Sequence, residues 1–167
     1  MRTKKLTLAL LMATAMAVPC LAQNETKTAE TKYYHLDFVV KELEGGKATN
    51  SRNYAMMIST EHGDDSSMRT GNRVPLSTGA GQIQYLDVGV NIDCHGAREV
   101  QGNLLLNLSA EISGAASEPA GTQPVIRQNK WKSSVIVPLR KATTIFSSDD
   151  AYSKRQMQLE LTATPVM

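Results

Sequence analysis

Cysteine is almost absent from this sequence, which contains only Cys20 and Cys94 among its 167 residues. Cys20 lies in an N-terminal segment that we expect to be removed, so Cys94 has no partner for an intrachain disulfide. An unpaired cysteine can react, pair with another chain, or simply pack as a small residue at the end of a strand. We favour the packing interpretation for Cys94.

The chain also lacks an apolar run of the roughly 20 residues that a membrane-spanning helix needs. The longest run, Leu6–Val18, follows the basic residues Arg2, Lys4 and Lys5 and is followed by Pro19 and the sequence CLA. This order is typical of a secretory signal peptide. We therefore predict a signal peptide over residues 1–22, no transmembrane helix after its cleavage, and an exported protein in the periplasm, at the outer membrane or in the medium.

The mature chain lacks a strong charge of either sign. The full sequence has 18 Lys and Arg against 16 Asp and Glu, and cleavage after Ala22 would remove three basic residues and no acidic one. The remaining 15 basic and 16 acidic residues include no basic patch of the kind that binds nucleic acid. We therefore expect no nucleic-acid partner.

Sequence patterns for catalysis and for metal binding are missing as well. The three histidines, His35, His62 and His95, lie in no serine-nucleophile motif, and G-x-S-x-G does not occur. Cys94 and His95 are neighbours, but neighbouring side chains on a strand point to opposite faces. Pairs of acids at 64–65 and 149–150 are typical of solvated turns. We therefore predict no catalytic residue, no metal site, no cofactor and no enzymatic activity.

Aromatic residues are scarce, at 5% of the chain, and Trp131 is its one tryptophan. Trp131 lies between Lys130 and Lys132, where it could form a binding surface for a carbohydrate or a peptide. A single tryptophan in an all-β domain also commonly packs at the core or its rim. Both interpretations remain open from the sequence.

Alternation with a period of two is what the sequence does contain. In YYHLDFVVKEL, the side chains of Tyr34, Leu36, Phe38 and Val40 share one face, as in a half-buried strand. Gly45-Gly46 between two alternating runs indicates a tight hairpin turn. Further strands are expected over the ranges 48–60, 68–70, 73–78, 82–94, 104–113, 124–139, 142–146 and 154–164, with a loop over 95–102.

No part of the mature chain shows a convincing helical period. Eight to nine strands separated by turn residues predict an all-β fold, either an antiparallel sandwich or a partly closed barrel. We expect a flexible mature N-terminus at residues 23–32 and a single domain over residues 33–167. Pro75 lacks an amide donor, so its strand should lie at an edge or at a bulge.

The segment QYLDVGVNID, residues 84–93, places an acid and a glycine inside an alternating strand. Gly89 indicates a bulge or the close approach of another backbone segment. Asp87 could accept hydrogen bonds from amides that a bulge leaves unpaired. We interpret both residues as structural rather than catalytic or ligating.

The segment RTGNRVPLSTGAGQIQYLDVGVNID resembles the core of the secretins, the outer-membrane channels of type II and type III secretion and of type IV pili. The similarity rests on a G-x-x-V-P segment followed by Y-x-D-V-G-V, with the matching residues Gly71, Val74, Pro75, Tyr85, Asp87, Val88, Gly89 and Val90. Downstream, GNLLLNLSAEIS is similar to a secretin strand that ends in Glu-x-Ser, here through Glu111 and Ser113. The resemblance spans roughly residues 69–166.

The chain departs from the secretin pattern where Lys141–Ile145 replace the usual Gly-Gly block. The resemblance implies a secretin-like β-domain in a short exported envelope protein without enzymatic activity. Such a protein would act through protein–protein or strand-pairing contacts. Its partners would be envelope or secretion-system proteins, or further copies of itself. The alternative is a β-sandwich module that binds a carbohydrate or a peptide near Trp131.

Overall fold

The computed structural model describes residues 30–61, 63–77, 81–115, 125–150 and 153–166. Within these residues the chain is all-β and forms eight strands. The strands are β1 (Tyr33–Glu44), β2 (Lys47–Ser59), β3 (Asp65–Ser77), β4 (Ile83–Val100), β5 (Asn103–Ala115), β6 (Ile126–Pro138), β7 (Thr143–Asp149) and β8 (Arg155–Val166). The predicted signal peptide and most of the predicted flexible segment lie outside the described residues.

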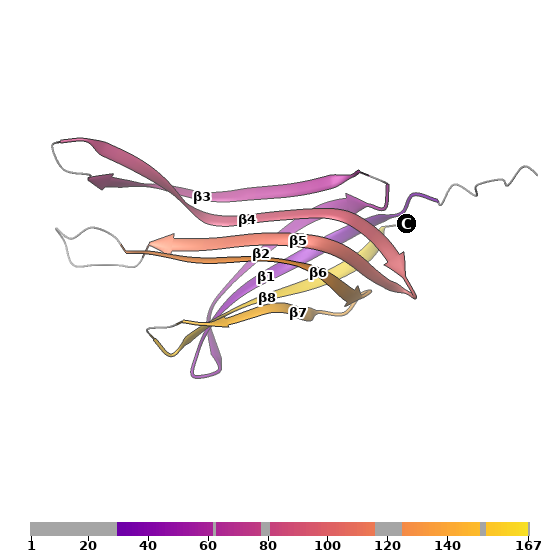
Figure 1. Ribbon diagram of the computed structural model, residues 1–167. Helices are drawn as coiled ribbons and strands as arrows, with labels where there is room; N and C mark the ends of the chain where they lie inside the picture. Colours follow the sequence, from indigo (N-terminus) through magenta and orange to yellow (C-terminus); the bar gives the residue numbers. More distant parts are fainter. Residues whose placement is uncertain (1–29, 62, 78–80, 116–124, 151–152, 167) are drawn as a thin grey trace, which may run out of the picture.

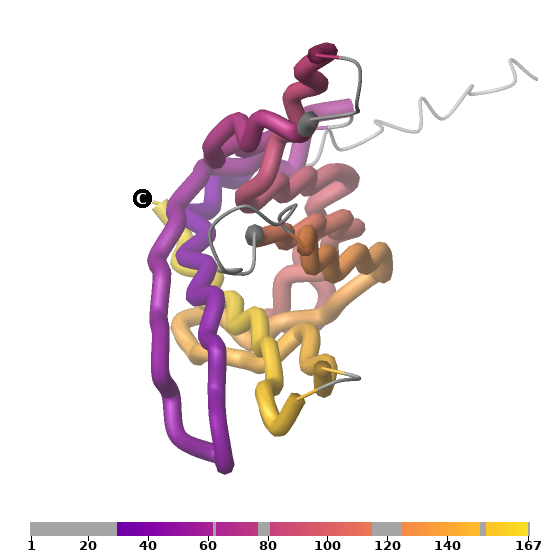
Figure 2. The backbone as a smooth tube through the Cα atoms, turned by 90° about the vertical axis from the view of Figure 1, so that its left-hand side faces the viewer, coloured from indigo at the N-terminus to yellow at the C-terminus, as the bar shows by residue number. Residues whose placement is uncertain are grey.

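The strands form two antiparallel sheets of four, in the orders β2-β1-β8-β7 and β3-β4-β5-β6. Figure 2 shows the sheets as two layers, and Figure 1 shows that their strands run at an angle, so the β1–β2 hairpin and the β3–β4 hairpin diverge. The sheets touch where Leu139, just after β6, forms an isolated bridge with Ala163 of β8. The predicted sandwich is therefore confirmed, and a closed barrel is not formed by the described residues.

The core comes from the alternating faces that the sequence indicates. In β1, Tyr34, Leu36, Phe38 and Val40 are each buried to 1% exposure or less, and they face the buried side chains of the second sheet. That sheet contributes Val90, Ile92, Cys94, Leu104, Leu106, Leu108, Ala110, Ile112 and Val137. Because the outward positions of the same strands are largely polar, each sheet has one dry and one wet face.

The predicted Gly-Gly hairpin is present between β1 and β2. Glu44 pairs with Lys47, and the two turn residues Gly45 and Gly46 have φ angles of 58° and 80°. Two successive positive φ angles are the geometry that matches the twist of a two-residue hairpin and that glycine adopts without a steric penalty.

The two largest departures from the predicted strand boundaries lie in β3 and β4. The ranges 68–70 and 73–78 are one continuous strand, β3, because Gly71 stays extended and pairs with Gly89 of β4. The expected loop over 95–102 is mostly strand, since β4 continues to Val100 with a register shift between His95 and Arg98. A bulge therefore bends β4 where the sequence suggested a loop.

A polar cluster ties the start of β1 to the end of β4. Glu99 Oε2 accepts hydrogen bonds from Lys32 Nζ at 2.6 Å and from Tyr34 OH at 2.8 Å. These two donors hold the pKa of Glu99 below its usual value, and burial together with the Glu99 hydrogen bond raises the pKa of Tyr34 to about 12. The cluster fixes the first described residues onto the second sheet.

Within the described ranges, the structure has no helix that is long and apolar enough to cross a membrane.

Candidate functional site

The β3–β4 hairpin extends beyond the rest of its sheet. β4 pairs with β5 only from Val90 onward, so residues 83–89 of β4 have β3 as their one strand partner in the described structure. We call residues 72–77 of β3 and 83–88 of β4 the arm. Figure 1 shows it at the upper left, projecting past the end of β5. Most of the residues that match the secretin sequence pattern lie on this arm.

A pair of glycines forms the base of the arm. Gly71 of β3 lies opposite Gly89 of β4, and a Cβ atom placed on Gly89 would lie 2.0 Å from Thr70 O and 2.5 Å from Gly71 Cα. A Cβ atom on Gly71 would lie 2.1 Å from Val88 O. Neither position has room for a side chain. Of the two explanations that the sequence left open for Gly89, close backbone approach is the one observed, and no register shift occurs between β3 and β4 there.

Ser113 takes the place of the backbone ladder where β4 separates from β5. The last backbone pair is Val90 with Ile112, and the next amide, Gly89 N–H, donates to Ser113 Oγ at 3.0 Å. Ser113 is one of two buried polar residues in the part of the chain that the structure describes, at 8% exposure. The hydroxyl therefore satisfies a partly buried amide at the position where the arm leaves the sheet.

We expect replacement of Ser113 by Ala to cost about 1 kcal/mol of unfolding free energy, because the Gly89 amide would lose its acceptor in a partly buried place. Urea denaturation followed by circular dichroism measures the change. Ser109→Ala, on the same face of β5, serves as the control and should change stability by less than about 0.5 kcal/mol. An equal loss in both variants would contradict a specific role for the Ser113 hydroxyl.

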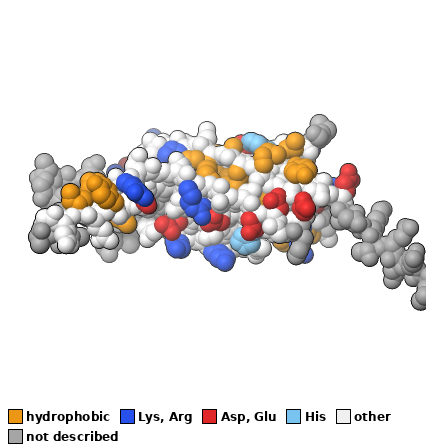
Figure 3. Space-filling model, turned by 90° about the horizontal axis from the view of Figure 1, so that it is seen from above, with side chains coloured by type: hydrophobic (Ala, Val, Ile, Leu, Met, Phe, Trp, Pro, Cys, Tyr) orange, Lys and Arg blue, Asp and Glu red, His pale blue; other side chains and the backbone are white. Residues whose placement is uncertain are grey.

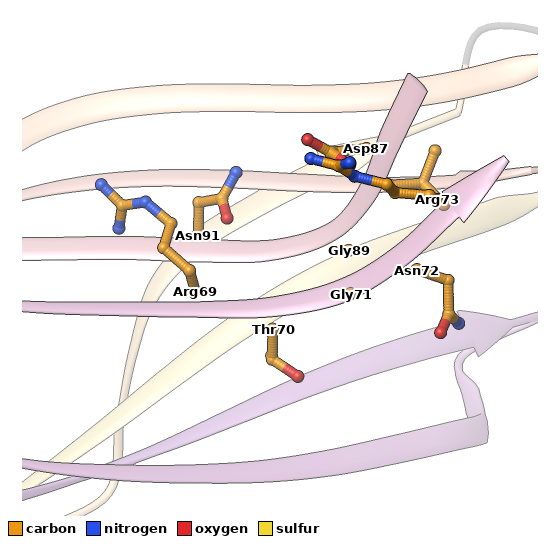
Figure 4. Close-up of a pocket in the computed structure, with 9 residues that line it drawn as sticks. Arg69, Thr70, Gly71, Asn72, Arg73, Asp87, Gly89 and Asn91 are labelled. Carbon is orange, nitrogen blue, oxygen red and sulfur yellow. The ribbon is translucent and has the colours of Figure 1, made fainter. Parts of the chain in front are cut away.

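Asp87 makes an ion pair within the arm. Its Oδ1 accepts a hydrogen bond from Arg73 Nε at 2.9 Å, and the two residues are direct cross-strand partners. The side chains are 76% and 72% exposed, and Figure 4 shows them lying together above the strands. Asp87 was expected to accept a hydrogen bond from a backbone amide, and it accepts one from the Arg73 guanidinium instead. An ion pair this exposed contributes at most about 1 kcal/mol.

The arm exposes apolar side chains on both of its faces. Tyr85 and Ile83 are 62% and 63% exposed on the face that carries Asp87, while Leu86, at 37%, lies on the opposite face. Val74 pairs with Leu86, and Pro75 pairs with Tyr85. Figure 3 shows hydrophobic side chains gathered at the left end of the molecule, next to Lys and Arg side chains. Because the arm projects from the sandwich, the hydrophobic core of the sandwich cannot cover both faces of the arm.

The remaining motif residues divide between the arm and the core. Val88 is half-buried at the base of the arm, and Val90 is fully buried in the core cluster. Pro75 lies on β3, an edge strand, as its missing amide donor predicted. The motif therefore marks the transition from a packed sheet to a projecting hairpin, and nothing in it resembles a catalytic arrangement.

A shallow hollow lies beside the glycine pair. Its volume is about 410 Å³, and it is bounded by Arg69 and Asn91 on one side and by Arg73 and Asp87 on the other, with the two glycines between them. In Figure 4, Arg69 and Asn91 point away from the strands side by side, while Thr70 and Asn72 point to the opposite side. The two glycines contribute only backbone to the lining between these side chains. The sequence reasoning missed Arg69, although its spacing of four residues from Arg73 places both on one face of a strand.

Trp131 packs against the protein rather than standing open. It pairs with the buried Ala110 and lies 5.5 Å from Phe146 between ring centroids, with the rings inclined at 38°. Nearby, Arg127 Nη1 lies 3.4 Å from Asp150 Oδ2. These contacts close one side of the sandwich between β6 and the β7–β8 hairpin, and they agree with the packing interpretation of Trp131. A binding role for this residue stays a prediction that no contact supports.

The other reactive residue types are dispersed. Cys94 is buried, and burial raises the pKa of its thiol to about 12, so it stays protonated at neutral pH. His35 Nδ1 lies 3.1 Å from Asp37 Oδ2 on the outer face of β1, and His62 lies outside the described residues. Among the residues that the structure describes, no group of three or more His, Cys, Asp or Glu could hold a metal ion.

Comparison with known proteins gave matches at the level of structure alone. No family model matches the sequence, and a search of curated proteins gave no match. The secretin InvG of the Salmonella SPI-1 type III secretion injectisome is similar over 82% of this chain and 64% of its own, with 8% identity and a TM-score of 0.49. The type II secretin GspD from enteropathogenic Escherichia coli is similar over 82% of this chain and 66% of its own, with 10% identity and a TM-score of 0.47.

Aeromonas hydrophila ExeD is similar over 81% of this chain and 46% of its own, with 12% identity and a TM-score of 0.44. The chain therefore spans less than two thirds of the InvG chain and about half of the ExeD chain.

Proposed function

We propose that this protein is a non-enzymatic, exported envelope protein with a secretin-like β-domain, and that it acts through protein–protein contacts made by the arm. The observation that carries the proposal is the arm itself, which projects beyond its sheet and exposes Ile83, Tyr85 and Leu86. Burying exposed apolar area yields roughly 25 cal/mol per Å², so covering both faces of such a hairpin is favourable.

Two further features support the proposal. Among the described residues, no further strand pairs with either edge of the arm, because β4 leaves β5 at Gly89 and β3 is the edge strand of its sheet. Unpaired strand edges are templates for pairing with another chain. The D-V-G-V motif of the secretin resemblance ends at the base of this arm. The glycine pair and Ser113 thus serve to build the projecting hairpin.

We expect the purified protein to self-associate through the arm and the triple variant Ile83→Ser, Tyr85→Ser, Leu86→Ser to remain monomeric. Size-exclusion chromatography with light scattering, with and without detergent, measures the difference over a range of protein concentrations. The matched control replaces three exposed apolar residues outside the arm, Tyr33, Val125 and Ile136, by Ser. A wild-type protein that is monomeric under every condition, or a control variant that dissociates equally, would contradict the proposal.

A further inference from the structure

Charge is distributed unevenly between the edge strands and the central strands. The three long edge strands β2, β3 and β6 carry seven Lys and Arg residues and one acid, Asp65. The central strands β1, β4, β5 and β8 carry eight Asp and Glu residues and three Lys and Arg. Basic side chains at edges oppose the pairing of one such edge with another, because like charges would face each other.

Cross-strand ion pairs connect the two sets. Arg52 Nη2 lies 2.8 Å from Glu42 Oε1, Arg69 Nη2 lies 2.6 Å from Asp93 Oδ1, and Lys130 Nζ lies 3.4 Å from Glu111 Oε2. In each pair, the acid belongs to the central strand that is hydrogen-bonded to the edge strand. On the outer side of each edge strand, where another strand would add, no acidic strand of the described structure lies next to these basic residues.

The β3 edge is the most accessible of the three at its middle. Every residue from Arg69 to Arg73 is exposed, so neither face of this stretch is covered. Arg69 and Arg73 share one face with Gly71 between them, and they flank the hollow. By contrast, side chains on the β6 edge contact the opposite sheet through Trp131–Phe146 and Asn129–Met157. In β2, a register shift lies between Lys47 and Arg52, and Arg52 is half-buried beside Glu42, so this edge does not offer two exposed basic residues on one regular stretch.

From this charge complementarity we propose that the β3 edge binds an extended, acidic segment of another protein, which adds to the sheet as a fifth strand. The carboxylates of such a segment would lie opposite Arg69 and Arg73, four residues apart on one face, with a small residue opposite Gly71. Backbone hydrogen bonds supply affinity in this mode of recognition, and side chains at alternate positions supply specificity. The inference rests on the proposed role of this protein in protein–protein contacts and names the chemistry of one partner.

The test uses synthetic probe peptides and fluorescence anisotropy on the purified protein. The acidic probe TEVGVEVTV, aligned antiparallel to β3, places its two glutamates opposite Arg73 and Arg69 and its glycine opposite Gly71. The basic probe TKVGVKVTV differs only at those two positions. We expect the acidic probe to bind at least about tenfold more tightly, and the difference to shrink at high salt.

Three variants locate the site. Arg69→Gln with Arg73→Gln should weaken binding of the acidic probe by about tenfold, since two charge contacts are lost. Lys130→Gln with Lys132→Gln, on one face of the other edge strand in the same sheet, should leave it unchanged. Arg69→Glu with Arg73→Glu should invert the preference and favour the basic probe. That last result cannot come from unfolding, because it is a gain of binding.

N-methylation of the acidic probe tests strand addition directly. Only alternate amides of an added strand face β3, so methyl groups on one alternating set should abolish binding and those on the other set should not. Equal binding of both methylated probes, equal binding of acidic and basic probes, or an equal loss in the β6 variant would each overturn the proposal. The arm variants leave Arg69 and Arg73 intact. Persistent self-association without probe binding would therefore refute this inference and leave the proposed function standing.

Discussion

Replacing Gly89 by Ala should destabilise the protein by about 3 kcal/mol, which corresponds to a fall in Tm of roughly 10 °C for a domain of this size. The added Cβ atom would lie 2.0 Å from Thr70 O and 2.5 Å from Gly71 Cα, both of them backbone atoms of the paired strand. Neither atom can move away without separating β3 from β4. The φ angle of 156° adds backbone strain for any residue other than glycine.

Gly114→Ala is the matched control for this prediction. Gly114 lies on β5, and a Cβ atom placed there would meet nothing within 4 Å. That variant should change stability by less than about 0.5 kcal/mol. Thermal unfolding followed by circular dichroism compares the two. If the Gly89→Ala variant had the same Tm as the Gly114→Ala control, the close approach of the two glycines would not be a feature of the protein in solution.

Replacing Phe38 by Ala should cost about 4 kcal/mol, the largest loss that we expect from a single substitution in this protein. Phe38 is fully buried at the centre of β1, where it pairs with Tyr54 of β2 and Leu161 of β8. The variant loses the transfer free energy of the ring and leaves a cavity between the sheets, because the backbones on both sides are fixed by their own ladders.

The neighbouring Val39 provides the control for Phe38. Val39 is half-buried on the outer face of the same strand, so Val39→Ala removes apolar atoms from β1 without opening the core. We expect a loss of about 1 kcal/mol or less for it. Guanidinium denaturation measures the loss of unfolding free energy in both variants, provided that the m-value does not change. A loss below about 1 kcal/mol for Phe38→Ala would mean that the two sheets do not pack through this residue.

The sequence predicted the fold class well because the signal was local. The alternation of Tyr34, Leu36, Phe38 and Val40, and the Gly45-Gly46 turn, depend on residues that are neighbours in the chain, and each was found as expected. Boundaries that depend on distant partners were wrong. Residues 68–70 and 73–78 looked like two strands because Gly71 interrupts the alternation, and only its pairing with Gly89 shows why the strand continues.

The candidate site followed the same division. A close backbone approach at Gly89 could be inferred from a glycine inside an alternating strand, but Ser113, 24 residues further along, could not be assigned as its partner. The partner of Asp87 was also missed, because the pairing of Arg73 with Asp87 depends on the register of two strands. The arm was invisible in the sequence, since it exists only because β5 stops pairing at Val90.

The pairing of the first strand with the last has a consequence for how the chain acquires its structure. β1 forms its ladder with β8 along its whole length, from Tyr33 opposite Val166 to Glu44 opposite Arg155. A chain that emerges with its N-terminus first must therefore hold the β1–β2 hairpin with one side unpaired until the 12 residues of β8 have been made. Deletion of β8 would leave β7 without its strand partner and would leave the β1–β2 hairpin in an aggregation-prone intermediate.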